Sequence, residues 1–71
     1  MMTYRVKVKE FEKGKYITTN IILCDVQGKD LDEEIIVKRL TNNIKTWQSA
    51  YNKGRIQGKR IFEIDCYERV K

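Results

Sequence analysis

The fold is decided by residues 3–26, which read TYRVKVKEFEKGKYITTNIILCDV. Residues 3–11 alternate apolar with charged side chains, and this period of two is typical of a strand with one buried face. Residues 16–26 are rich in β-branched and aromatic residues, which predicts a second strand. Between them, Gly14 can adopt the positive φ that a tight turn requires. The stretch therefore predicts an antiparallel hairpin.

A two-residue turn at 13–14 also predicts how the two strands pair. Val6 would lie opposite Ile21, and the apolar residues of both strands would share one face. Cys24 would then lie on the other, open face. A slip of one residue would mix the two faces, so this register is the one that the pattern favours.

The middle of the chain predicts one long helix, residues 31–52. Asp30 is a good N-cap, and Glu33 stands where a capping box places its second member. Gly54 follows as the expected C-terminal cap. Apolar residues recur at spacings of three and four, which gives the helix one buried stripe. The stripe consists of Ile36, Leu40, Ile44, Trp47 and Tyr51.

Residues 60–70 predict a third strand, with Phe62, Ile64 and Cys66 facing the helix. A right-handed crossover carries the chain from the second strand over the first. The third strand would then lie beside the first and antiparallel to it, in the order 3-1-2. We expect a single small α+β domain, residues 1–71, with β-β-α-β topology and the helix on one face of the sheet.

Composition narrows the class of protein. The 71 residues carry a formal net charge of +5 and include no histidine, which is the commonest general base and metal ligand. No catalytic, cofactor or metal-binding motif is present, and no apolar run approaches the ~20 residues of a membrane span. We therefore expect a cytoplasmic, non-enzymatic protein with no cofactor and no membrane partner. Abundant Ile, Lys, Asn and Tyr, a single Ala and no Pro suggest an AT-rich genome, such as that of a low-GC bacterium or one of its phages or plasmids.

The predicted topology separates the charges. Acids gather where the helix begins, and basic residues gather at the hairpin tip and in the loop before the third strand. The acids are Asp25, Asp30, Asp32, Glu33 and Glu34. The basic residues are Lys13, Lys15, Lys53, Arg55, Lys59 and Arg60.

Two interpretations of the basic end are open. The six cations could neutralise phosphates of a nucleic-acid backbone, with the nearby glycines allowing close approach. They could instead only complement the dipole at the C-terminus of the helix. Both interpretations stay open, and the functional prediction that follows from the first is a small binding module for nucleic acid. The alternative is a protein-interaction module, such as a phage- or mobile-element-encoded inhibitor that docks on an acidic surface of a host protein.

Two further surfaces are candidates. Leu31 and Ile35 point away from the helical stripe, and such an exposed pair could form a partner or homodimer contact, or be ordinary surface residues. The open sheet face could stack bases, since basic and aromatic residues alternate there. Glu63 and Asp65 would neutralise that face, so a salt-bridged surface is the competing interpretation. Its basic and aromatic members are Arg5, Lys7, Lys9, Tyr16 and Tyr67.

Overall fold

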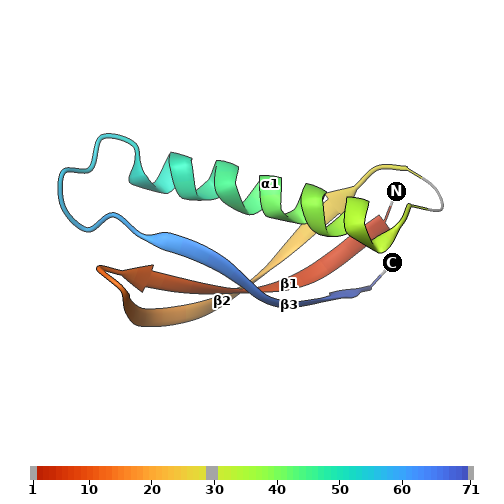
Figure 1. Ribbon diagram of the computed structural model, residues 1–71, viewed down its shortest axis with the longest axis horizontal. Helices are drawn as coiled ribbons and strands as arrows, with labels where there is room; N and C mark the ends of the chain where they lie inside the picture. Colours follow the sequence, from red (N-terminus) through yellow and green to blue (C-terminus); the bar gives the residue numbers. More distant parts are fainter. Residues whose placement is uncertain (1, 29–30, 71) are drawn as a thin grey trace.

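The computed structural model describes residues 2–28 and 31–70. In chain order the elements are β1 (Met2–Glu12), β2 (Lys15–Val26), α1 (Glu33–Asn52) and β3 (Ile61–Arg69). The three strands form one antiparallel sheet in the order β2-β1-β3, and α1 crosses one of its faces (Figure 1). The predicted α+β class, the β-β-α-β order and the place of β3 beside β1 are confirmed.

The predicted register of the hairpin is wrong by one residue over most of its length. Val6 lies opposite Ile22, not Ile21, because β2 contains a bulge. Tyr16 and Thr18 pair with consecutive residues of β1, which leaves the residue between them without a partner in β1. The extra residue of the bulge is Ile17. A bulge reverses the face of every residue beyond it. Cys24 is therefore buried under the helix, whereas it was expected on the open face.

A second bulge lies in β3. Lys7 pairs with Cys66 and Val8 pairs with Ile64, which leaves Asp65 as the extra residue. Cys66 is exposed although it was expected in the core, and Tyr67 packs against the core although it was expected on the open face. Both corrections have one cause, since a residue inserted at position 65 exchanges the two faces of the strand beyond it.

The core lies between α1 and the inner face of β1. Leu40, Val6 and Val8 are completely buried there. The core predicted from the two periodicities is confirmed for Phe62 and for three residues of the helical stripe, whereas Trp47 and Ile64 are only partly buried. The three buried stripe residues are Ile36, Leu40 and Ile44.

Helix α1 begins two residues later than predicted. Its N-cap is Asp32, which makes no capping hydrogen bond with its side chain, and the expected cap Asp30 lies outside the described residues. Leu31 precedes the helix and packs against the core, so it does not form an exposed pair with Ile35. The other end follows the prediction, because Gly54 adopts a φ of 76° just after the C-cap.

Candidate functional site

The hairpin tip and the loop 53–60 lie at the same end of the elongated domain, opposite the two chain termini (Figure 1). We call this region the basic end; it comprises the six predicted cations at positions 13, 15, 53, 55, 59 and 60. The two loops approach each other through an ion pair. The Nε of Arg60 lies 4.0 Å from the Oε1 of Glu12, at the end of β1.

Local backbone geometry sets the tip of the hairpin. Lys13 and Gly14 have φ values of 51° and 78°. Two successive positive φ angles are the mark of a type I′ turn, which matches the twist of the strands that it joins. Glycine adopts this conformation freely, whereas lysine does so at a cost in backbone strain. Lys13 therefore occupies a position that Asn or Gly would fill with less strain.

We expect Lys13→Asn to stabilise the fold by about 1 kcal/mol, because asparagine tolerates the left-handed region better than lysine. Urea denaturation followed by the fluorescence of Trp47 measures the change. Lys15→Asn is the matched control, since Lys15 belongs to a strand and has no positive φ. A lower midpoint for Lys13→Asn would contradict the assignment of this turn.

The loop 53–60 is closed by one side chain. Asn52, the last residue of α1, donates from Nδ2 to the carbonyl of Arg60 and accepts from the Arg60 backbone N–H, both at 2.8 Å. The side-chain amide thus donates to and accepts from the backbone of one residue, as a residue of a neighbouring strand would. These two hydrogen bonds hold the ends of the loop together. Gly54 and Gly58, each with a φ of 76°, provide the turns between them. The backbone of the loop is therefore closed at its base by Asn52, and the side chains of the loop project from this closed backbone, which we call the frame.

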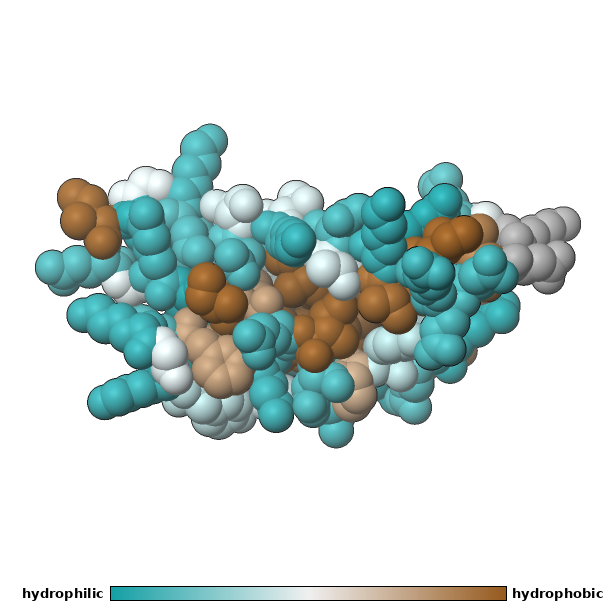
Figure 2. All heavy atoms as spheres, in the orientation of Figure 1, coloured by the Kyte–Doolittle hydropathy of each residue, from teal (hydrophilic) through white to brown (hydrophobic). Residues whose placement is uncertain are grey.

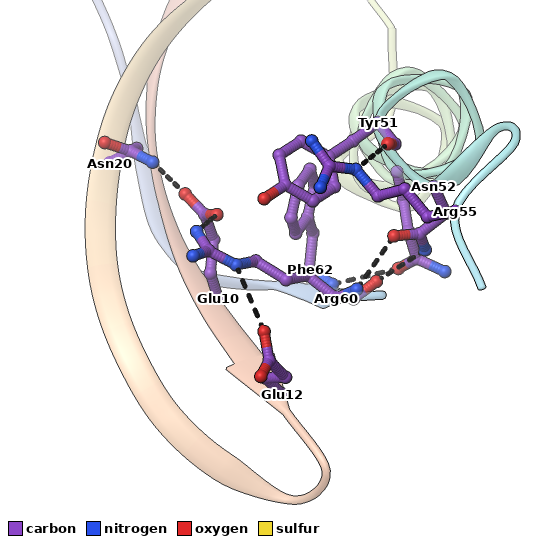
Figure 3. A network of polar contacts seen from close by, with 9 residues as sticks. Glu10, Glu12, Asn20, Tyr51, Asn52, Arg55, Arg60 and Phe62 are labelled. Carbon is purple, nitrogen blue, oxygen red and sulfur yellow. Dashed lines mark hydrogen bonds and ion pairs between the residues drawn. The ribbon is translucent and has the colours of Figure 1, made fainter. Parts of the chain in front are cut away.

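Arg60 is the cation that ties this frame to the sheet (Figure 3). Its Nη1 donates to the Oε1 of Glu10 at 2.9 Å, and Glu10 is only 2% exposed. The second carboxylate oxygen of Glu10 accepts from the side-chain amide of Asn20. The hydrogen bond to Glu10 raises the pKa of Arg60 further above its ordinary value. Arg60 thus neutralises a buried acid. Because the Arg60–Glu10 pair has no net charge, it attracts an anionic ligand less than a free arginine would.

Arg55 is also held in place, but it remains exposed. Its guanidinium carbon lies 4.2 Å from the centre of the Tyr51 ring, and its Nε donates to the Tyr51 carbonyl at 2.8 Å. A cation over an aromatic face is attracted by the ring quadrupole. Because these contacts occupy Nε and one face of the guanidinium, its terminal nitrogens remain available to a ligand.

The remaining four cations of the basic end are lysines with exposed side chains, and none forms an ion pair within residues 2–28 and 31–70. The only acid in either loop is Glu12, and it lies beside Arg60. The sequence pattern thus placed the cations together but did not separate Arg60 from the rest. The signal for this was available: Glu10 occupies an inward position of an alternating strand, so it needs a buried partner.

The open sheet face carries two ion pairs between β1 and β3. Arg5 donates to Glu68 at 2.6 Å, and Lys9 lies 3.4 Å from Asp65. The expected neutralisation by Glu63 and Asp65 is thus carried out by Glu68 and Asp65. Ile21 and Leu23, which the bulge in β2 turns outward, are 58% and 67% exposed on this face.

A groove of about 1100 Å³ runs between α1 and β3. Its apolar walls are visible in the centre of Figure 2, where hydrophobic side chains lie open between the helix and the strand. Val37, Ile44 and Ile64 line it, with Glu33 and Lys45 among the charged residues. The hydroxyl of Tyr67 donates to Glu33 at 2.7 Å at one end, and this bond raises the pKa of Tyr67. The sequence pattern did not reveal this groove.

No group of His, Cys, Asp and Glu side chains in the described part of the chain is arranged to hold a metal ion. None of the helical residues described is part of a segment long and apolar enough to cross a membrane. The comparisons with known proteins add no assignment: no protein-family model, no curated protein and no solved structure matches this chain.

Proposed function

We propose that the chain is a cytoplasmic, non-enzymatic module that binds nucleic acid by neutralising backbone phosphates at its basic end. One observation carries the proposal. Two loops far apart in sequence are joined through Arg60 and its two acids, and the lysines of the basic end form no ion pair with any described residue. Lysine and arginine side chains held close together can neutralise several successive phosphates of a nucleic-acid backbone at once.

The helix dipole accounts for only part of this grouping of charge. The last turn of α1 contains no basic residue; beyond it, Lys53 is the C-cap and Arg55 donates to the Tyr51 carbonyl of that turn. The effect of a dipole is confined to that final turn. The hairpin tip belongs to the sheet, so Lys13 and Lys15 gain nothing from it. A lysine at the strained position 13 is a further sign of function, because strain that persists in a fold is often kept for a purpose.

The polarity of the domain supports the same proposal. Asp32, Glu33 and Glu34 surround the start of α1, at the opposite end from the basic loops. A charge distribution of this kind orients a protein toward a polyanion before contact. The basic end would therefore approach first, while the acidic end stays in solvent.

The test is a salt titration of binding to labelled duplex and single-stranded oligonucleotides, followed by fluorescence anisotropy. If about three to five phosphates are neutralised, the logarithm of the affinity for duplex should fall with the logarithm of salt concentration at a slope of roughly −3 to −5. Arg55→Ala and Lys59→Ala should each weaken binding to all sequences alike and make the slope less steep. Lys38→Ala, an exposed lysine of α1 away from the loops, is the control. Absence of binding at low salt would rule out the proposed function.

A second function rests on a separate observation. The exposed Ile21 and Leu23 and the apolar groove beside α1 could contact a protein. In that case the chain would be a phage- or mobile-element-encoded inhibitor that docks on a host protein as a monomer or a homodimer, and the basic end would meet an acidic protein surface. Affinity for such a partner should survive high salt better than affinity for phosphates, because apolar contacts are not screened.

A further inference from the structure

The open face of the sheet ends in an aromatic row beside the basic loops. Phe11 of β1 pairs with Tyr16 of β2 on one side and with Ile61 of β3 on the other. Directly paired residues of an antiparallel sheet point to the same face. We call these three residues the end row. Tyr16 and Ile61 are 56% and 53% exposed, and Phe11 is half-buried between them.

The two rings of the end row are held in a defined arrangement. Their centroids are 6.1 Å apart and their planes meet at 73°, an edge-to-face contact. The hydroxyl of Tyr16 lies 2.7 Å from the Oγ1 of Thr19, a hydrogen bond that fixes the orientation of the Tyr16 ring. An aromatic ring that is more than half exposed and yet fixed in place can accept a flat partner with little loss of entropy.

Charge around the end row favours an anionic partner. Lys13 lies in the turn at the end of the row, whereas Lys15 stands opposite Glu12 in the strand pairing and so starts on the other face of the hairpin. On the next row of the same face, Lys9 lies opposite Glu63 and is paired with Asp65. Glu12 lies beside Arg60 in the adjoining loop. A ligand on the end row would thus meet an aromatic surface first, with Lys13 in the adjoining turn.

We infer that the end row stacks the bases of single-stranded nucleic acid, while the phosphates that follow lie on the lysines of the hairpin tip. This inference rests on the proposed function and names its substrate class. A single strand can turn its bases toward a protein, and stacking on aromatic side chains tolerates every base because each has a π face. A duplex keeps its base faces stacked inside and could use only the cations.

The experiment compares three labelled ligands of equal length at low salt: oligo-dT, oligo-U and a DNA duplex. The wild type should bind both single strands more tightly than the duplex. Tyr16→Leu keeps an exposed apolar side chain but removes the ring. It should weaken single-strand binding about 5- to 160-fold, which corresponds to the roughly 1–3 kcal/mol lost when one stacking aromatic is removed, and leave duplex binding within about twofold. Leu23→Ala, at the far end of the same strand and face, is the matched control and should change neither affinity.

The outcomes separate the two claims. If the duplex and the single strands bind equally well and Tyr16→Leu changes nothing, the inference is wrong and phosphate binding stands. If none of the three ligands binds at low salt, the proposed function is wrong and the inference falls with it. The thermal midpoint of each variant, followed through Trp47 on the opposite side of the sheet, confirms that the fold is intact.

Discussion

Leu40→Ala should destabilise the domain by about 2–5 kcal/mol, the range for a buried leucine truncated to alanine. Leu40 is completely buried at the centre of the stripe of α1. A domain of this size is expected to have a total free energy of unfolding of only about 4–10 kcal/mol. The variant should therefore be partly or wholly unfolded at physiological temperature. Urea denaturation at low temperature, followed by circular dichroism, measures the loss.

Ile35→Ala is the matched control, because Ile35 lies on the same helix and is 39% exposed. Surface substitutions of this kind stay within about 0.5 kcal/mol of the wild type. Equal stability of Leu40→Ala and the wild type would show that α1 does not pack on the sheet through this stripe.

Glu10→Met is expected to be the second most disruptive change, at about 1–3 kcal/mol, because it removes the acceptor of two donors in a partly buried site. Those donors are the amide of Asn20 and the guanidinium of Arg60. Thermal and urea midpoints should both fall. The same substitution should also weaken nucleic-acid binding, because the loop 53–60 loses its link to the sheet.

Two variants make this prediction specific. Glu63→Met places the same side chain at an exposed glutamate of β3 and should be nearly neutral. The double variant Glu10→Met with Arg60→Met should recover much of the lost stability, since replacing both members of a buried ion pair by apolar groups is often tolerated. A double variant that is less stable than either single one would contradict the coupling of these two residues.

Much of the fold was predictable because its main signals are local. The alternation in residues 3–11, the turn glycine at position 14 and the stripe of α1 each depend only on neighbours in the sequence. The place of β3 beside β1 followed from the handedness of the crossover. These signals set the order of elements and the position of the basic end.

The two bulges could not be predicted in the same way. Without a bulge, both Ile21 and Leu23 would be inward, and this arrangement is as apolar as the observed one with Ile22 and Cys24. The pattern of hydrophobicity is therefore nearly balanced between the two registers. What distinguishes them is a contact in three dimensions: the observed register brings Asn20 to the buried carboxylate of Glu10. The pairing of Arg60 with Glu10 was missed for a different reason: the inward position of Glu10 indicates a buried partner but does not say which cation it is.

The bulges at Ile17 and Asp65 have a consequence for the behaviour of the chain among its own copies. Both lie in outer strands, β2 and β3, whose outward backbone groups meet no further strand among residues 2–28 and 31–70. A long, flat edge of this kind is a template on which further strands can add, and this is a common route to aggregation. Each bulge breaks the regular spacing of hydrogen-bonding groups and increases the local twist. We therefore expect the irregularities that displaced the predicted register to oppose uncontrolled self-association of this small β-rich protein as well.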